Sequence, residues 1–418
     1  MKKSIIYWAL LFAVLSGVAQ KKGEKLPNWK QGYLDIHHIN SGMGDCTFFV
    51  FPDGTTMLFD AGEMDITKER MKGPRNASRK PNDTRNPGEW MASYIMKLQE
   101  GLPYKEIDYA ALSHFHDDHM GTPHPLSLKS KYGNYKLTGI TAIGEYIKIN
   151  KMLDRGWPNY DYPSSLNNEM MTNYRSFIEW QQSNNGMVPE KFEAGTNEQI
   201  QLLHKKNEFP NFELRNIAVN GEVWTGVADN IRANFPEIKS LISEGKSLPG
   251  ENPCSLAFRI SYGKFDYFTG GDIPGILNHG DPLWKDMETP VAKAVGPVEV
   301  NVLNHHGNKD SQNPFFLETL RPRVHIMSVW SSDHPGDTVL SRLLNKQIYE
   351  GSRDIFATNM VEANYNVIGS NLDVLKSAQG HIVVRVLPGG ASYYVIILDD
   401  TDDKNHKVKA TFGPYTSR

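Results

Sequence analysis

The chain has 418 residues and a formal net charge of −3, with 22% charged and 39% hydrophobic residues. These values are ordinary for a globular protein with room for two or three average domains. No run of lysine and arginine stands out, so the composition does not support a strong nonspecific affinity for nucleic acid or for an anionic membrane.

The N-terminus has the pattern of an export signal. A basic stretch, MKK, precedes the apolar run SIIYWALLFAVLSGV, and small residues follow it. This pattern predicts a signal peptide over residues 1–20, cleaved between Ala19 and Gln20, and a periplasmic or secreted protein. An uncleaved anchor is the alternative, disfavoured because the run is shorter than the roughly 20 residues that span a bilayer. No later segment is long and apolar enough, so we expect no stable membrane anchor after cleavage.

Short apolar or alternating runs predict strands in the first part of the chain. Three of them are YLDIHHI, CTFFVF and TTMLFDAG, at residues 33–39, 46–51 and 55–62. The turn sequence PDG between the last two predicts a β-hairpin. Residues 63–88 are polar and predict an exposed loop, and the apolar spacing in residues 88–101 predicts a helix.

The predicted strand EIDYAALS, at residues 106–113, is followed by a segment with a different sequence pattern. Residues 122–250 hold helix-like and turn-rich stretches with one plausible strand, FELRNIAV, and predict a large helical and loop insertion. Strand and helix signals alternate again from residue 254 to a terminal hairpin near residues 380–400. The alternation predicts an α/β fold with two facing sheets and helices outside, in a single domain over residues 21–418.

Three histidines and two aspartates follow the strand at residues 106–113, in LSHFHDDHMG. His114 and His116 are two apart, so extended backbone would project them the same way. A turn after them can bring Asp118 and His119 around to a common centre. Imidazole and carboxylate suit Zn²⁺, Mn²⁺ or Fe, and four such groups suit two adjacent ions better than one. The alternative is a polar surface loop with incidental histidines, which this spacing disfavours.

Other candidate ligands also follow apolar strands. Asp272 ends YFTGGD, His305 and His306 follow in VLNHHG, and His334 ends SVWSSDH. Each alone has an ordinary structural explanation, a helix N-cap for the aspartate and a satisfied core or surface histidine for the others. Because strand ends gather ligands at one edge of a sheet, the set together predicts a metal site.

These segments resemble a known family. HFHDDH matches the H-x-H-x-D-H motif of metallo-β-lactamase-fold hydrolases. GMGDCTFFVFPDGTTMLFDAG, NPCSLAFRISYGKFDYFTGGD, VNVLNHHGN and VHIMSVWSSDHPGDTVLSRL resemble the hydrolase domain of ComEC-type competence proteins and its stand-alone secreted relatives. The resemblance covers residues 32–122 and 250–350, with a weak continuation to about 400. It implies a four-layer αββα sandwich with a dinuclear site at one edge of the two sheets.

The resemblance also implies roles for individual residues. His114 and His116 would hold one ion, Asp118 and His119 the other, and Asp272 would bridge them. One residue of the HHG loop, with His305 favoured over His306, would complete the shell of the first ion, and His334 that of the second. The residues expected to support the ligands or flank the site are Asp60, Asp45 and Asn252. The ions implied are two divalent cations, zinc first, with manganese or iron as alternatives.

Two departures from the family pattern stand out. Many members carry a further histidine ligand before the bridging aspartate, but here the segment between Met120 and Asp272 holds only His124 and His204, and neither follows a clear strand. We therefore assign that role to the HHG loop. In addition, the serine that usually follows HHG is Asn308, which weakens the expectation of a phosphate contact there.

The expected function is hydrolysis by an activated water held between two cations. Asp118 would orient this nucleophile, and His306, if it is not a ligand, would donate a hydrogen bond or a proton to the substrate. The resemblance favours a phosphodiester substrate, either nucleic acid or a small molecule. Hydrolysis of a lactone, β-lactam or other carboxylic ester is the first alternative, because the fold serves many chemistries. A metal-stabilised binding protein without turnover is the second.

The two cysteines leave a further question open. Cys46 and Cys254 both lie in apolar, strand-like contexts, and neither has the spacing of a metal site. Export permits a disulfide, yet two buried free thiols are at least as compatible with these contexts.

Overall fold

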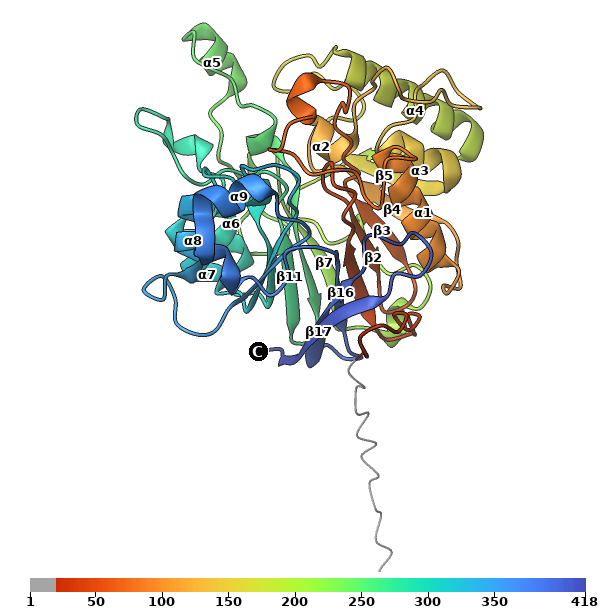
Figure 1. Cartoon of the computed structure of the whole chain (residues 1–418). Coiled ribbons are helices and arrows are strands. Elements are labelled where there is room, and N and C mark those ends of the chain that lie inside the picture. The colour runs from red at the N-terminus through yellow and green to blue at the C-terminus, as the bar shows by residue number, and fades with distance from the viewer. Residues whose placement is uncertain (1–19) are drawn as a thin grey trace, which may run out of the picture.

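The computed structural model describes residues 20–418, and the predicted signal peptide up to its cleavage site after Ala19 lies outside them. Two large mixed β-sheets face each other, and helices cover their outer sides (Figure 1). The α/β class predicted from the sequence is confirmed.

The first sheet has nine strands and is antiparallel in one half and parallel in the other. The predicted hairpin is present in it, with Thr47 paired to Phe59. In spatial order the strands are β17 (Val408–Thr416), β16 (Ser392–Leu398), β15 (His381–Val386), β1 (Leu34–His38), β2 (Thr47–Val50), β3 (Thr56–Phe59), β4 (Ile107–Ala111), β5 (Ile149–Asp154) and β6 (Val188–Lys191).

The second sheet has eight strands, and those nearest the site run parallel from β11 to β14. In spatial order they are β14 (Asp354–Ala357), β13 (Val324–Met327), β12 (Val300–Val302), β11 (Phe265–Thr269), β10 (Ala257–Tyr262), β7 (Phe212–Val219), β8 (Glu222–Trp224) and β9 (Ile231–Ala233). The polar loops that follow β11, β12 and β13 therefore emerge at the same edge.

Helices pack on both outer faces. The first sheet is covered by α1 (Pro87–Gln99), α3 (Ile140–Tyr146) and α4 (Glu169–Asn185), and the second by α6 (Glu288–Val295), α7 (Pro314–Leu320) and α8 (Asp337–Leu344). The short helix α2 (Asp117–Met120) lies at the upper edge in Figure 1, α5 (Ile238–Ser243) projects from the body, and α9 (Glu362–Ile368) follows β14. The helix predicted at residues 88–101 is α1, and its N-terminus carries a capping box between Asn86 and Glu89.

The central core lies between the sheets and is rich in aromatic side chains. Phe49 of the first sheet meets Tyr267 of the second at a centroid distance of 5.7 Å and an interplanar angle of 83°, and Phe59 meets Phe258 at 4.9 Å and 87°. All four rings are at most 4% exposed. Burial of each such side chain is worth roughly 2–3 kcal/mol, and edge-to-face geometry adds to it. This core fixes the two sheets relative to each other.

Residues 122–250, expected as a helical and loop insertion, contribute strands to both sheets. β5 and β6 extend the first sheet, and β7, β8 and β9 extend the second. Of these strands, only β7 was predicted. β9 is fully exposed and three residues long, so it lacks the apolar alternation by which a strand is recognised.

Cys46 and Cys254 are free and buried, so the alternative of two buried thiols holds.

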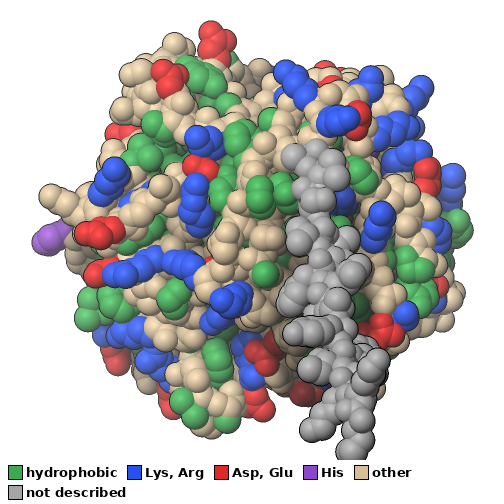
Figure 2. All heavy atoms as spheres, turned by 90° about the horizontal axis from the view of Figure 1, so that it is seen from below, with side chains coloured by type: hydrophobic (Ala, Val, Ile, Leu, Met, Phe, Trp, Pro, Cys, Tyr) green, Lys and Arg blue, Asp and Glu red, His purple; other side chains and the backbone are tan. Residues whose placement is uncertain are grey.

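Among residues 20–418, helices fall short of the length and apolar character needed to cross a bilayer. On the surface at the bottom of Figure 1, lysine and arginine side chains are mixed with those of aspartate and glutamate (Figure 2).

Candidate metal centre

The first donors lie where β4 ends and the chain turns into α2. Residues 113–115 bend and do not continue the extended strand, in contrast to the expectation. His114 and His116 nevertheless meet, with His114 Nε2 3.0 Å from His116 Nδ1. The helical turn of α2 then brings Asp118 and His119 to the same place, and the rings of His114 and His119 are 4.2 Å apart.

Asp272 comes from the second sheet, in the loop after β11. The preceding Gly271 has a φ of 54°, and a Cβ at this position would lie 2.7 Å from the Cβ of Ser113. Only a glycine permits this close approach of the two loops. As a result, Asp272 Oδ1 lies 3.1 Å from His119 Nε2, and Oδ2 lies 3.7 Å from His114 Nε2. Asp272 is 2% exposed and contacts both parts of the histidine group.

His306 completes the most compact part of the site. It follows β12 in the turn Asn304–Gly307 and has a left-handed φ of 54°. Its Nε2 lies 3.0 Å from Asp118 Oδ2 and 3.6 Å from Asp272 Oδ1, and its Nδ1 lies 3.1 Å from Asp45 Oδ1. Left-handed backbone is costly for a residue with a Cβ and is enriched at functional sites.

His305 lies beside this group and has different neighbours. Its φ is also left-handed, at 50°. Its Nδ1 lies 2.7 Å from Asp310 Oδ1, and its Nε2 lies 3.2 Å from Asn252 Nδ2 and 3.7 Å from Asp272 Oδ2. The side chain is 19% exposed, in contrast to the 1% of His306.

His334 reaches the centre from the loop after β13. Its ring stacks on His306 at a centroid distance of 4.4 Å and meets Trp330 edge-on at 4.9 Å. The His334 carbonyl accepts a hydrogen bond of 2.8 Å from Asn364 Nδ2, which fixes the loop. His334 Nδ1 is buried and has no hydrogen-bond partner among the described residues.

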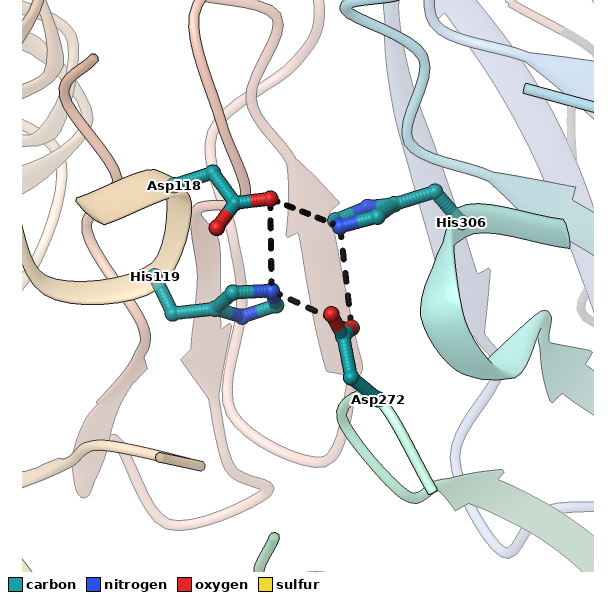
Figure 3. Close-up of side chains that lie close together, drawn as sticks. All are labelled: Asp118, His119, Asp272 and His306. Carbon is teal, nitrogen blue, oxygen red and sulfur yellow. Dashed lines mark hydrogen bonds and ion pairs between the residues drawn. The ribbon is translucent and has the colours of Figure 1, made fainter. Parts of the chain in front are cut away.

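Two groups of donors result. Asp118, His119, Asp272 and His306 converge from both sheets (Figure 3), and their ligand atoms lie within 4.8 Å of one another. His114, His116 and Asp272 form a second such group. Asp272 belongs to both, so the two groups adjoin.

A further layer of side chains holds the donors in place. Asp60 Oδ2 lies 2.9 Å from His119 Nδ1, and Oδ1 accepts a 2.6 Å hydrogen bond from the Ser113 amide. Ser113 Oγ also lies 3.0 Å from His114 Nδ1. Metal-binding imidazoles commonly use their second nitrogen in this way, which orients the ring and fixes the tautomer. Asp60 therefore lies where its carboxylate can orient the His119 ring.

The electrostatic surroundings keep some donor atoms unprotonated, so that a cation can bind them without displacing a proton. Burial lowers the pKa of His114 and of His334 well below the usual value, so both rings are neutral and offer a lone pair. Burial alone would raise the pKa of Asp118 and of Asp272, but the His119 and His306 imidazoles outweigh it and hold both pKa values low.

The pKa values of His119 and His306 shift in the opposite direction to those of His114 and His334. Burial opposes their protonation, yet the surrounding carboxylates raise the pKa of both rings well above the usual value. For His119 the main carboxylate is Asp272, and for His306 it is Asp45. A cation bound by these two rings would displace their protons, so metal binding here should release protons.

The burial of unpaired donor atoms also indicates that the donor set fits a metal ion. His334 Nδ1 is buried without a hydrogen-bond partner among the described residues, and the buried His119 Nε2 and Asp272 Oδ1 pair with each other as ions, at 3.1 Å. Unsatisfied buried polar atoms are costly and call for an explanation such as an ion. Zinc bonds to nitrogen and oxygen are about 2.0–2.2 Å long, so ligand atoms around one ion lie roughly 3–3.5 Å apart. The buried Asp118, His119, Asp272 and His306 group can therefore hold a metal ion.

The structure differs from the expectation at the HHG loop. His306, expected as a free hydrogen-bond donor, lies inside the four-residue donor group, and the favoured ligand His305 lies outside both groups. His124 and His204, the two histidines between Met120 and Asp272, belong to neither donor group. His124 is buried 3.0 Å from Glu63, and His204 stacks on Tyr104.

Sequence reasoning missed a buried glutamate that supports the HHG loop. Glu288 Oε1 accepts hydrogen bonds from Asn304 Nδ2, at 2.8 Å, and from the Gln312 amide, at 2.6 Å. Its Oε2 accepts a 2.6 Å hydrogen bond from the Asn313 amide. Burial raises the pKa of Glu288 to about 7. A charged residue at the first turn of a surface helix gives no sequence signal that distinguishes it from an exposed one.

A scan against protein-family models and a search of curated proteins both return no match to this chain. What the centre can do is therefore inferred from its own side chains, their burial and their distances.

Proposed function

We propose that this protein is an exported hydrolase that uses two divalent metal ions to cleave a phosphodiester, in a nucleic acid or in a small molecule. The observation that carries the proposal is the position of Asp272, a buried carboxylate shared by two adjoining donor groups. A carboxylate in that position is suited to bridge two cations.

Zinc is the proposed metal, with manganese or iron as alternatives. Donors in both groups are imidazole nitrogen and carboxylate oxygen, and the two cysteines are outside them. This chemistry suits borderline cations such as Zn²⁺. His334 stacks on His306, and its unpartnered Nδ1 makes it a further candidate ligand beside the four-residue group.

Bound divalent cations would supply a Lewis acid for the phosphoryl oxygens and would activate water as the nucleophile. Asp118 lies in the four-residue group, where its carboxylate can accept a hydrogen bond from the attacking water and orient it. His305 is held through Nδ1 by Asp310 and is partly exposed, so it is the better placed of the two adjacent histidines to give a proton to the leaving group. Relative to the expectation from sequence, His305 and His306 exchange roles.

The architecture supports membership of the metallo-β-lactamase-fold hydrolases. Two facing sheets with helices on their outer sides fit an αββα sandwich, and the donors sit at one edge, on loops from both sheets. The resemblance of the HFHDDH, GGD and HHG segments to ComEC-type hydrolase domains is consistent with this arrangement.

Metal analysis joined to an activity panel tests the proposal. Protein secreted from cells would be examined for a mature N-terminus at Gln20 and for bound metal by mass spectrometry, with two divalent ions per chain expected. The panel comprises bis-p-nitrophenyl phosphate, DNA, RNA, nitrocefin and a lactone. Hydrolysis of a phosphodiester is expected, and turnover confined to nitrocefin or the lactone would contradict the proposed substrate.

A matched pair of variants ties the activity to the centre. Asp272→Asn removes one charge from the shared carboxylate and should lower metal content and reduce kcat/KM at least a hundredfold. Asp373→Asn makes the same change at an exposed aspartate outside both donor groups and should change neither quantity. Metal-bound protein with no turnover on any substrate would indicate a binding protein.

A further inference from the structure

His116 has less side-chain support than the other histidines of the two donor groups. Its Nδ1 lies 3.0 Å from His114 Nε2, and its other ring nitrogen has no protein hydrogen-bond partner among residues 20–418. The other histidines of the groups each have a hydroxyl or carboxylate oxygen at the second nitrogen, from Ser113, Asp60 and Asp45. His116 is also partly exposed, whereas those histidines are buried. The His116 ring is therefore placed by the backbone that carries it.

The backbone between His114 and His116 is held by Glu251. Its Oε2 accepts a 3.0 Å hydrogen bond from the amide of Phe115, the residue between the two histidines. The Phe115 ring is 3% exposed and packs edge-on against Tyr160 at a centroid distance of 5.8 Å. Phe115 is thus fixed through both its side chain and its amide, and the amide contact is the one that depends on a charged group.

Arg155 in turn holds the Glu251 carboxylate. Its Nε lies 3.0 Å from Glu251 Oε2 and its Nη2 donates to Oε1, so the pair has two contacts. Its Nη1 donates to the Tyr162 carbonyl, at 2.8 Å, and to Asn220 Oδ1, at 3.2 Å. The guanidinium also lies 4.8 Å from the centroid of the Phe115 ring, and Arg155 is 1% exposed. Because each of its three nitrogens is engaged, the planar group has one orientation and fixes that of Glu251.

The pair also joins the two sheets beside the smaller donor group. Arg155 follows β5 of the first sheet, whereas Glu251 lies in the segment before β10 of the second. Asn220, which follows β7, closes the link, because its Nδ2 donates a 2.8 Å hydrogen bond to the Arg155 carbonyl. Desolvation of two buried charges offsets much of their attraction, so such a pair contributes little net stability. Fixed geometry at the neighbouring loop is the role that its contacts support.

Resting on the proposed function, we infer that Arg155 and Glu251 are positioning residues for one of the two metal ions. This ion is the one at the smaller donor group, here called the three-residue group, which consists of His114, His116 and Asp272. The pair holds the Phe115 peptide and thereby aims the His116 ring at this group. The three-residue group has one donor fewer than the other group, and its His116 is partly exposed. Its ion is therefore the more weakly bound of the two, and the pair sets that affinity.

Zinc titration of the metal-free protein by calorimetry tests the inference. The wild type should bind two ions in two steps of different affinity, and His116→Ala should abolish the weaker step and so identify it. Arg155→Lys keeps the charge but lacks the planar face that makes two contacts with a carboxylate. In this variant the weaker step should lose affinity at least tenfold, the usual effect of removing an outer support of a ligand, while the tighter step stays within threefold.

Arg385→Lys is the matched control. Arg385 makes the same kind of two-contact pair with Asp35, at 2.9 and 2.6 Å, and its side chain is 5% exposed. Both residues lie outside the donor groups. The control should lose stability as Arg155→Lys does and keep both zinc affinities. Circular dichroism and melting temperature establish that each variant is folded.

Glu251→Asp separates the contact with Phe115 from the charge. Aspartate is shorter by one methylene, so it can face Arg155 but cannot also reach the Phe115 amide. The weaker step should again lose affinity at least tenfold. Hydrolysis of bis-p-nitrophenyl phosphate at two equivalents of zinc should fall at least tenfold, and excess zinc should restore it to within threefold, because Glu251 acts through His116 and touches neither substrate nor ion.

Failure of the inference is distinct from failure of the proposed function. Unchanged zinc affinities in the Arg155 and Glu251 variants, equal losses at both steps, or the same selective loss in Arg385→Lys would overturn the positioning role while the phosphodiesterase activity stands. Two bound ions without hydrolysis of any phosphodiester would overturn the proposed function and leave the selective loss of one ion as a test of positioning. Fewer than two ions in the wild type would overturn both.

Discussion

Asp60 shows how much of the centre depends on a residue outside both donor groups. One carboxylate oxygen orients the His119 ring, and the other holds the Ser113 amide at the start of the same loop. The carboxylate is 1% exposed, and burial raises its pKa, although hydrogen bonds and the nearby imidazole oppose this effect. Ser113 and His119, on the loop that follows β4, hold the buried Asp60 carboxylate in place through these contacts.

Asp60→Ala should weaken metal binding by about ten- to a hundredfold, because His119 loses the group that fixes its ring. Titration with a competing chelator measures the change, and circular dichroism checks the fold. Asp373→Ala, at an exposed position, provides the matched control. Unchanged affinity in the Asp60 variant would show that the ring is oriented by other contacts.

His325, remote from the centre, makes stability depend on pH. It is fully buried, its Nε2 lies 2.9 Å from Tyr349 Oη, and burial lowers its pKa to about 3. The unfolded chain binds a proton below about pH 6.5 while the folded protein does not, so the stability from this group is lost as pH falls.

His325→Gln removes the titration and keeps a hydrogen-bonding side chain. The loss of unfolding free energy between pH 7 and pH 5 should be smaller in the variant by roughly 2 kcal/mol, from the 1.36 kcal/mol per pH unit of a fully titrating group. Urea denaturation at the two pH values measures it. Parallel losses in both proteins would contradict this role for His325.

At the scale of elements, the centre is made by strand ends that place donors on loops at one edge. The sequence allowed α1, β4, the β2–β3 hairpin and the donor-bearing loops to be predicted, because apolar runs end abruptly at polar residues. The sequence did not allow us to decide whether His305 or His306 lies in the donor group. Both residues sit in the same motif, and a left-handed turn decides which ring faces Asp118.

The strands β9 and β17 were missed for a related reason. β9 is exposed throughout, and β17 is a mostly half-exposed edge strand whose pairing with β16 contains register shifts. Neither has the alternation of apolar and polar residues that marks a strand with one buried face. Both segments are strands because they pair with a neighbouring strand, β8 for β9 and β16 for β17, and their own residue pattern does not indicate it.

Gly271→Ala tests the close approach of the two loops. A Cβ at this position would lie 2.7 Å from the Ser113 Cβ on left-handed backbone, so the β11 loop must move outward and carry Asp272 with it. We expect a loss of about 2–4 kcal/mol of stability and a weaker affinity for metal.

The matched control is Gly186→Ala. Gly186 also has a left-handed φ, of 67°, but no atom lies within 4 Å of the added Cβ. This variant should lose only about 1 kcal/mol and keep its metal affinity. Equal effects of the two substitutions, measured by thermal denaturation and chelator competition, would show that backbone conformation alone matters at Gly271.

At the scale of the whole molecule, the donors come from both sheets. His114, His116, Asp118 and His119 follow β4 of the first sheet, whereas Asp272, His306 and His334 follow strands of the second. A bound ion would connect the two sheets at the edge where the aromatic core between them ends. A bound metal ion would therefore also contribute to the stability of the assembled pair of sheets.

Removal of metal by a chelator should lower the melting temperature, because ligands that bind only the folded state stabilise it by mass action. A shift of about 5 °C or more is expected, corresponding to roughly 4 kcal/mol or more for a chain of this size. Calorimetry with and without chelator measures it, and re-addition of zinc should restore the transition. No change would mean that the sheets hold together independently of the centre.

The distance along the chain between donors has a consequence for biogenesis. His114 and His334 are separated by more than half of the chain, and the long segment between them must fold into both sheets before they meet. A growing polypeptide therefore lacks His306 and His334 until part of its final third has been synthesised. A cation held by the finished protein would be taken up where folding is completed, and the metal supply of that compartment would decide which ion is loaded.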